Sequence, residues 1–284
     1  MSRLTVDHVV IIVRDLPCAV RDFANLGFSV SQGGVHEGGL SHNALILLED
    51  GSYLELFAPV RPLTMTLLVL MDKLGVLGGI TSKRTSIVRR FLEHVARGEG
   101  IADIALLTDS LDEQLESARR NGLPMDKPLL GSRIRPDGQE SKWRFGVPMM
   151  NGLPFLIEDL TPRMLRVPEN AARRHANGVS GIARIDVEVS DRVQANANCC
   201  ALLGLSCDTE PRQVDASKAA LYFRVSGVDL ALVECTDDEW TGRGSSAKTR
   251  PGQISLRLRT TDKANVGPLD SRQTHNARIE LVSA

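Results

Sequence analysis

A repeated order of predicted elements most constrains how this chain of 284 residues can fold. Residues 4–13 are rich in Val and Ile and predict a strand that ends near Asp15. Helical spacing follows as far as Gly27, and three short apolar segments before residue 58 predict three more strands. The same order begins again at three later positions, which are Ile101, Ile182 and, in a shortened copy, Gln253. The sequence therefore predicts tandem βαβββ modules.

Two stretches lie outside the repeats and show how the modules are grouped. Residues at about 62–98 follow a helical pattern, which predicts a helical insert between the first two modules. Residues 161–178 contain two Pro and several Arg, and they read as a connector. We therefore expect an α+β protein with an N-terminal domain at 1–165 and a C-terminal domain at 179–284, whose last module is shortened.

Composition and charge narrow the classes of protein that fit the sequence. Lys and Arg total 34 and Asp and Glu total 35, a net charge of −1 that argues against a general nucleic-acid binder. Aromatic residues make up 4%, too few for a base-stacking surface. The sequence has neither an apolar run of membrane length nor a signal-peptide core, and its five Cys form no C-x-x-C pair. We expect a cytoplasmic protein with reduced thiols that acts on a small molecule, without nucleic-acid or membrane partners.

Several segments resemble the vicinal oxygen chelate superfamily, which includes glyoxalases, bleomycin-resistance proteins and extradiol dioxygenases. The superfamily resemblance rests on residues 4–11, the turn at 14–16 and residues 53–56, and residues 33–46, 131–143 and 153–159 are similar to its glyoxalase-like branch. The resemblance covers most of residues 1–235. It implies paired βαβββ modules around a cup that commonly holds a divalent metal. Members include lyases, isomerases, dioxygenases and metal-free binding proteins, so the fold does not name the reaction.

The resemblance also implies where a metal would be held. The family's ligand on the first strand is usually His, here His8, and its ligand on the last strand is usually Glu, here Glu55. These donors suit Zn, Mn, Fe or Ni, with Mg also considered, and a metal would compensate a buried carboxylate. Without one, the glutamate would be solvated and the histidine would be a hydrogen-bonded core residue. Aligning the first two modules puts Asp103 opposite His8 as a third ligand, and it leaves Leu156 or Glu158 opposite Glu55.

The third module departs from this pattern. Aligning Asp15 with Asp191 puts Arg184 at the position of His8 and Ala231 at the position of Glu55. Neither residue type at these positions fits the family's ligand pair. We therefore expect the site to lie in the N-terminal half, with the C-terminal half as a structural copy or as the dimer-forming part of a homodimer.

Further residues of the N-terminal half are candidates for catalysis and substrate binding. His36 and His42 flank a glycine-rich loop, and either could complete a metal site or move a proton. Their alternative role is to pin the loop. Four more residues are assigned to substrate binding: Asn43, Arg133, Arg135 and Trp143. The guanidinium groups suit a carboxylate or enolate, although solvated charges and a core Trp are the simpler alternatives. His94 and His275 receive no role.

The leading functional hypothesis is a metal-dependent lyase or isomerase. The metal would act as a Lewis acid toward two neighbouring substrate oxygens, and an enolate or alkoxide would be stabilised. A metal-free binding or sequestering protein is the first alternative, and a metal-free cyclase or hydrolase is the second. An extradiol-type dioxygenase ranks lower, because it needs a second histidine at a secure position.

Overall fold

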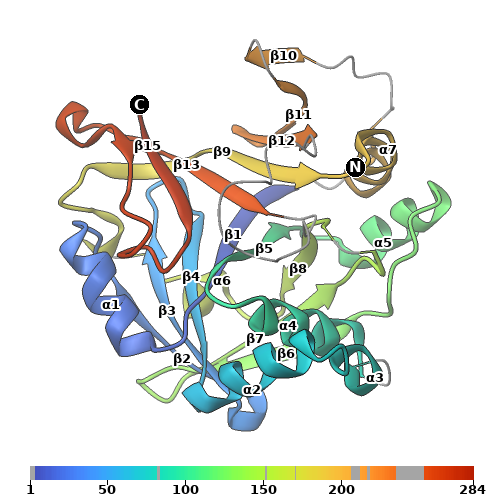
Figure 1. Ribbon diagram of the computed structural model, residues 1–284, viewed down its shortest axis with the longest axis horizontal. Helices are drawn as coiled ribbons and strands as arrows, with labels where there is room; N and C mark the ends of the chain where they lie inside the picture. Colours follow the sequence, from blue (N-terminus) through green and yellow to red (C-terminus); the bar gives the residue numbers. More distant parts are fainter. Residues whose placement is uncertain are drawn as a thin grey trace.

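The chain folds into an eight-stranded barrel with a second β-sheet on top of it, in a computed structural model (Figure 1). The structure describes residues 4–81, 84–150, 152–169, 171–205, 212–215, 218–234 and 253–284. No helix within these ranges has the length and apolar character needed to cross a membrane. Cys207 and Cys235 lie outside the described residues.

The barrel is built from the first two predicted modules. The first module comprises β1 (Thr5–Ile12), α1 (Leu16–Asn25), β2 (Ser31–His36), β3 (Ser41–Leu47) and β4 (Tyr53–Pro59). The second module comprises β5 (Gly100–Leu107), α5 (Leu111–Arg120), β6 (Leu129–Ile134), β7 (Glu140–Gly146) and β8 (Phe155–Asp159). Their strands close in the order β1-β4-β3-β2-β6-β7-β8-β5. The predicted order of one strand, one helix and three strands is confirmed in both modules.

The second sheet is built from the third module and the shortened fourth module. These contribute β9 (Val179–Val189), α7 (Arg192–Leu203), β10 (Arg212–Asp215), β11 (Lys218–Val225), β12 (Val228–Glu234), β13 (Ile254–Thr260), β14 (Gly267–Pro268) and β15 (Arg278–Ser283). The strand order is β10-β11-β12-β9-β13-β15-β14. Between β13 and β14 the chain forms only a short 3₁₀ turn at Lys263–Asn265, so the fourth module lacks the helix of the others.

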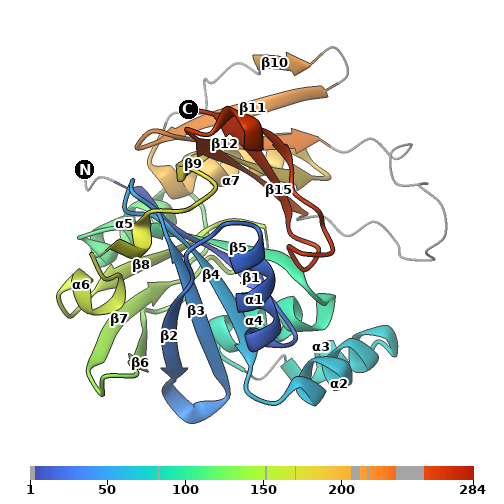
Figure 2. The ribbon, with the colours of Figure 1, turned by 90° about the vertical axis from the view of Figure 1, so that its left-hand side faces the viewer.

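The predicted helical insert consists of three helices. They are α2 (Pro62–Lys73), α3 (Leu77–Thr81) and α4 (Ser86–Arg97). The insert lies on the side of the barrel away from the second sheet (Figure 2). Met65 and Val95 of this insert pack with Val10 and Ile12, which point into the barrel. The insert therefore covers one part of the barrel interior with apolar side chains.

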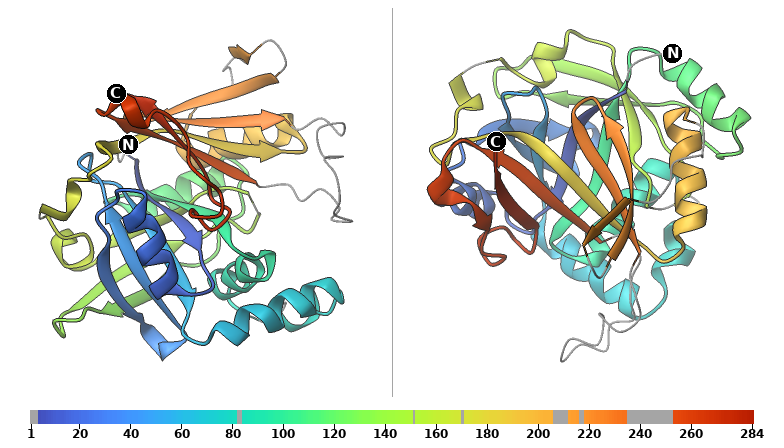
Figure 3. Two further views of the ribbon diagram at one scale, coloured as in Figure 1. Left: turned by 60° about the vertical axis from the view of Figure 1, so that its left-hand side comes forward. Right: turned by 90° about the horizontal axis from the view of Figure 1, so that it is seen from above.

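Strand alternation divides the barrel side chains into two sets. Because successive residues of a strand point to opposite faces, Val9 and Ile11 of β1 point outward while Val10 and Ile12 point inward. The outward set forms one hydrophobic cluster with Ile185 of the second sheet. The second sheet lies across the barrel in the view from above (Figure 3). One continuous apolar layer thus joins the two halves, while the division into two domains stays a prediction.

The segment expected to be a flexible glycine loop is partly a strand. Gly33 and Gly34 belong to β2, at a register shift between β2 and β3. A Cβ atom at Gly33 would lie 2.0 Å from Oδ1 of Asn43, and one at Gly34 would lie 2.2 Å from the carbonyl oxygen of Ile134. A side chain at either position would collide with these atoms, so glycine is required there. The expectation of a loop is therefore corrected for Gly33 and Gly34, which belong to a strand.

A buried ion pair fastens the connector to the barrel. Asp7 lies at a register shift of β1 and is fully buried. Arg166 of helix α6 (Arg163–Arg166) reaches its Oδ2 with Nη1 at 2.6 Å, and its Nε lies 2.5 Å from Oδ1 of Asp159. The Arg166 side chain is only 2% exposed. Arg163 of the same helix also reaches both carboxylates, so two arginines of the connector and two carboxylates of the barrel form one ion-pair network, in which Arg166 is the buried cation.

Replacement of Arg166 by Met should strongly destabilise the protein. Asp7 would then be a buried carboxylate without its main cation, and breaking such a pair costs about 3–5 kcal/mol. Urea unfolding followed by circular dichroism measures this loss. The matched control is Arg120→Met, because the Arg120 side chain is 71% exposed and should contribute below about 0.5 kcal/mol. Equal losses in the two variants would contradict the role given to Arg166.

Candidate functional site

A cavity of about 420 Å³ lies inside the barrel, beneath the insert. The chain has seven Phe, and four of them line this cavity: Phe57, Phe91, Phe145 and Phe155. Helix α4 contributes Phe91 and Ile87 to the lining. A protein poor in aromatic residues thus concentrates them around one cavity. A largely apolar cavity with a few polar groups is typical of a small-molecule site.

Four polar side chains from four adjacent strands meet on one wall of the cavity, and we refer to them as the Glu55 cluster. Its members are His8 of β1, Glu55 of β4, Asn43 of β3 and His36 of β2. Oε2 of Glu55 lies 3.3 Å from Nε2 of His8, and Oε1 lies 3.6 Å from Nε2 of His36. The Asn43 amide donates to Oε1 at 2.5 Å. The predicted metal ligands His8 and Glu55 are therefore neighbours, with His36 and Asn43 beside them.

Both histidines of the cluster are oriented from behind. Nδ1 of His8 lies 2.6 Å from Oδ2 of Asp7, and Nδ1 of His36 lies 3.1 Å from Oγ of Ser41. Each ring therefore presents Nε2 to Glu55. Burial is the largest influence on the pKa of Glu55 and raises it, but His36, His8 and Asn43 together lower this pKa to about 2. Glu55 is therefore an anion held between two imidazoles.

Asp103 occupies the predicted position but has different partners. Strand β5 runs antiparallel to β1, with His8 opposite Ala105 and Val10 opposite Asp103. The symmetry that relates the two modules maps the first of these pairs onto the second. Asp103 is therefore the counterpart of His8, and Ala105 is the counterpart of Val10. Its carboxylate accepts from Nε and Nη2 of Arg90 at 2.5 and 2.6 Å, and it lies 3.0 Å from Nε2 of His94. Burial raises the pKa of Asp103, but Arg90 and His94 hold it well below its usual value. Asp103 is thus paired with an arginine of the insert and does not join His8 and Glu55.

The counterpart of Glu55 in the second module is an aromatic residue. Val10 pairs with Glu55 across β1 and β4, and the symmetric residue Ala105 pairs with Phe155 across β5 and β8. The two residues left open by the sequence therefore have other positions: Leu156 belongs to the outer core, and Glu158 pairs with Arg144 at 2.7 Å. The second module supplies an arginine-bound carboxylate and a phenylalanine where the first supplies His and Glu.

The strand register also locates the third-module counterparts. Asp186 pairs with Ala231 across β9 and β12, as Val10 pairs with Glu55 across β1 and β4. This agrees with the alignment of Ala231 to Glu55 and of Arg184 to His8. Arg184 forms an ion pair with Asp186, and its guanidinium lies 4.8 Å from the ring centre of Tyr222. The third module therefore carries an ion pair where the first carries the Glu55 cluster.

Several nitrogen atoms in the cavity lining are buried without a hydrogen-bond partner among the described residues. Three of them are N–H donors, namely Nη1 of Arg90, Nε of Arg133 and Nε1 of Trp143, and the fourth is Nδ1 of His94. A buried donor without a partner costs about 1–3 kcal/mol, so such groups are uncommon in folded proteins. Their concentration in one cavity indicates a ligand that brings hydrogen-bond acceptors.

The substrate-binding residues predicted from the sequence divide into two groups. Asn43, Arg133 and Trp143 line the cavity, and Arg133 also reaches Oδ1 of Asn43 at 3.3 Å. Arg135 instead pairs with Asp137 at 2.9 Å and approaches the carbonyl oxygen of Leu165. Arg135 lies beyond the end of β6, in the turn before β7, and is absent from the cavity lining, so its role in substrate binding stays a prediction that this placement does not support.

The two predicted catalytic histidines are also separated. His36 belongs to the Glu55 cluster, whereas His42 is absent from the cavity lining. Its neighbours Ser41 and Asn43 point inward, so alternation along β3 directs His42 outward, which corrects its predicted role. Sequence reasoning missed His94 and Arg90. Their spacing of one helical turn is the signal that could have found them, because it places both on one face of α4.

Paired βαβββ modules closed around a cup, with His on the first strand and Glu on the last, define the vicinal oxygen chelate fold. The family model described as "Glyoxalase-like domain" matches residues 6–203, and the chain belongs to this family. No curated protein matches the sequence. The family therefore establishes the class of protein but not its reaction.

Solved structures confirm the fold over nearly the whole chain. A hypothetical protein from Staphylococcus aureus is 14% identical, with a TM-score of 0.69 and coverage of 98% of this chain and 100% of that chain. The 2,2',3-trihydroxybiphenyl 1,2-dioxygenase of Sphingomonas wittichii strain RW1 is 13% identical, with a TM-score of 0.52 and coverage of 98% and 90%. A mutant 4-hydroxymandelate synthase from Streptomyces coelicolor is 14% identical, with a TM-score of 0.51 and coverage of 91% and 71%. At these identities the likeness shows the fold alone.

Replacement of Asp103 by Asn should destabilise the protein and change its acid response. The variant leaves Arg90 buried without a counter-charge, which costs about 3–5 kcal/mol at neutral pH. In the wild type the pKa of Asp103 is lower in the folded state, so its stabilising effect is present above its usual value of 3.8 and is lost as the pH falls below it. Urea unfolding should show that the difference in the free energy of unfolding between wild type and Asp103→Asn is smaller at pH 3 than at pH 7. Asp112→Asn, at a side chain 65% exposed, is the control; a pH-independent difference for Asp103→Asn would contradict the prediction.

Proposed function

We propose that the protein is a metal-dependent enzyme of the glyoxalase-like type, which performs lyase or isomerase chemistry on a small oxygen-rich molecule in the barrel cavity. The observation that carries this proposal is the Glu55 cluster. In it, the two oxygens of a buried anionic carboxylate each face the Nε2 atom of a different imidazole. Unpaired N–H donors and an aromatic wall surround the same cavity.

The donor chemistry of the Glu55 cluster fits a divalent first-row metal. Two imidazole nitrogens and a carboxylate are ligands that Zn, Mn, Fe and Ni share. Asp7 and Ser41 hold the far nitrogens of the two rings, as partners behind metal-bound histidines usually do. His8, His36 and Glu55 would supply these ligands, and binding would draw the two rings together, because their Nε2 atoms and one Glu55 oxygen do not all lie within 4.8 Å of one another. When bound, the metal would act as a Lewis acid toward an oxygen of the substrate.

The unpaired N–H donors support a role for the cavity wall in substrate binding. Nε of Arg133 and Nε1 of Trp143 would donate to substrate oxygens, which satisfies groups that the protein leaves without partners. Arg133 is held in place by Asn43 and by the carbonyl oxygen of Arg166 at 2.8 Å, so it presents this donor without rearrangement. The aromatic side chains would keep water away from the reacting atoms. A small carboxylate or 2-oxo acid fits these donors.

His94 is the residue that we propose moves the proton. Asp103 receives Nε2–H of His94 at 3.0 Å, which orients the ring and leaves Nδ1 buried and unpaired beside the cavity. Arg90 keeps Asp103 ionised, so this carboxylate would stabilise a proton on His94 without accepting it. A carboxylate that orients a histidine in this way is a recurrent acid–base arrangement. His94 of the insert and Asp103 of the second module would thus contribute proton transfer in place of metal ligands.

A metal-free binding protein is the second candidate function. The ion pair of Asp103 with Arg90 and the presence of Phe155 at the counterpart of Glu55 favour this function, because the strands of the second module then offer no free ligand to a metal. The Glu55 cluster would then be a hydrogen-bonded network that holds a ligand. An extradiol-type dioxygenase would use the same two histidines and carboxylate, and it is distinguished by consumption of O₂ in the presence of ferrous iron.

Metal content should depend on the Glu55 cluster. When all proteins are purified without added metal, His8→Ala and Glu55→Ala are each expected to contain one equivalent of metal per chain less than the wild type, because each variant removes a ligand. Elemental analysis by mass spectrometry measures the content, and circular dichroism confirms that the variants fold. His42→Ala is the control, since it changes a histidine outside the cavity. Folded His8→Ala and Glu55→Ala proteins with wild-type metal content would exclude the metal-dependent enzyme.

Replacement of Arg133 should abolish ligand binding, whereas replacement of His94 should slow turnover and leave binding intact. A panel of small carboxylates and 2-oxo acids is expected to raise the Tm of the wild type, and this shift should disappear in Arg133→Met. His94→Gln should keep the shift but lower kcat by about 10²–10⁴-fold for any member that is converted.

Arg135→Met is the matched control for the panel, because Arg135 does not line the cavity and pairs with Asp137 in the turn beyond β6. If Arg133→Met and Arg135→Met changed the Tm shifts equally, the proposed substrate-binding role of Arg133 would be wrong. Unchanged kcat in His94→Gln would remove His94 from the mechanism while leaving the metal test unaffected.

A further inference from the structure

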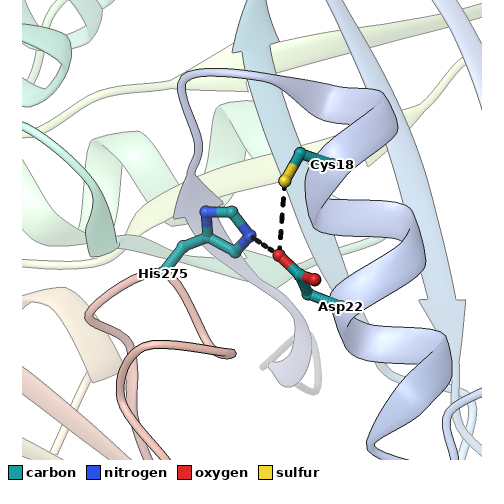
Figure 4. A group of neighbouring side chains, drawn as sticks. All are labelled: Cys18, Asp22 and His275. Carbon is teal, nitrogen blue, oxygen red and sulfur yellow. Dashed lines mark hydrogen bonds and ion pairs between the residues drawn. The ribbon is translucent and has the colours of Figure 1, made fainter.

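Two distant segments bring a thiol, a carboxylate and an imidazole together outside the barrel. Cys18 and Asp22 lie one turn apart on α1, so both side chains project from one face of that helix. His275 comes from the turn that precedes β15, near the end of the chain. Figure 4 shows the sulfur of Cys18, a carboxylate oxygen of Asp22 and a ring nitrogen of His275 pointing toward one another. The glyoxalase-like match ends at residue 203, so this group lies only partly within it.

The separations between these atoms suit a tetrahedral metal site. Sγ of Cys18 lies 3.4 Å from Oδ2 of Asp22, and that oxygen lies 3.2 Å from Nε2 of His275. With Zn–S near 2.3 Å and Zn–O or Zn–N near 2.0–2.1 Å, tetrahedral angles give separations of about 3.5 Å and about 3.3 Å. Among the described residues, this is the one group of three His, Cys, Asp or Glu whose ligand atoms all lie within 4.8 Å of one another.

His275 is oriented from behind like a metal-ligating histidine. Its Nδ1 lies 2.9 Å from Oε1 of Glu99, and the same oxygen accepts the backbone N–H of Arg14 at 2.9 Å. The ring also lies nearly parallel to Phe23, with an interplanar angle of 9°. Glu99 therefore directs Nε2 toward Asp22 and Cys18. A carboxylate behind a histidine is the usual outer partner of a zinc ligand.

We propose that Cys18, Asp22 and His275 form a second metal site, selective for Zn²⁺, that fastens the C-terminal module to helix α1. A thiolate and an imidazole favour zinc over Mg²⁺ or Ca²⁺, which prefer oxygen ligands alone. Binding would release the thiol proton and any proton on Nε2 to the solvent, and a water would complete the four ligands. The Asp22 side chain is 30% exposed, so an ion can enter from outside. The site shares no residue with the Glu55 cluster.

The same groups can also hold one another without a metal. In that arrangement a protonated His275 donates to both Glu99 and Asp22, and the Cys18 thiol donates to Asp22. This network would bind no cobalt and would respond to no added zinc. The two arrangements therefore predict opposite results when metal is added to the chelator-treated protein.

Cobalt substitution tests the proposal on the full-length chain. One equivalent of Co²⁺ added to the chelator-treated protein should produce the near-ultraviolet charge-transfer band of a cobalt–thiolate bond, which Zn²⁺ then removes. The band should be absent in Cys18→Ser and strongly weakened in His275→Asn. It should persist in Glu55→Gln, because the Glu55 cluster contains no cysteine, and in Cys199→Ser, because Cys199 is buried in α7.

Thermal stability gives a second readout. In the Glu55→Gln background, Zn²⁺ at about 100 times its Kd should raise the Tm by about 5 °C or more, and it should leave the double variant Cys18→Ser, Glu55→Gln unchanged. Absence of the band in folded wild type, or an equal band in folded His275→Asn, would overturn the second site. Neither result would bear on the metal of the Glu55 cluster, which Glu55→Gln reports separately.

Discussion

The compensation of three buried carboxylates organises this protein. Asp7, Glu55 and Asp103 are all buried in the barrel strands, where an isolated negative charge would be very costly. Asp7 is compensated by Arg166 of the connector, and Asp103 by Arg90 of the insert. Glu55 differs from both, because its partners are two imidazoles and an amide. Two of the carboxylates therefore hold elements in place, and the third is left with partners that exchange protons and bind metals.

The barrel is symmetric in its strands and asymmetric in its chemistry. Strand register places Asp103 where symmetry requires a counterpart of His8, and Phe155 where it requires a counterpart of Glu55. The insert between the two modules supplies the difference, since α4 contributes both Arg90 and His94. A divergent pair of modules can thus divide the work, with ion binding on one wall and proton transfer on the other. The proposed function uses this division.

Local pattern predicted the strand order and the position of Asp103, because the period of two and the turn residues are properties of each segment alone. The same pattern could not predict that Arg90 binds Asp103, since this contact depends on how the insert docks. Gly33 and Gly34 read as a loop, although close contacts with β3 and β6 place them in a strand. His42 lies between the cavity residues Ser41 and Asn43 on the opposite face of β3, and Arg135 lies in the turn beyond the end of β6. His94 receives no role from the sequence, because its position in a helix does not show which side chains lie opposite it.

The apolar layer between the barrel and the second sheet has a consequence for how such a protein can change over time. The third module has lost the ligand pair, yet its β9 residues complete the core that covers β1 and β4. If that sheet were removed, the part of this shared cluster that it covers would meet water, and an exposed patch of this kind invites aggregation. The C-terminal half is therefore free to diverge in its polar residues but not to disappear. The half without the ligand pair therefore has a structural task, which is to cover the outer face of the half that carries it.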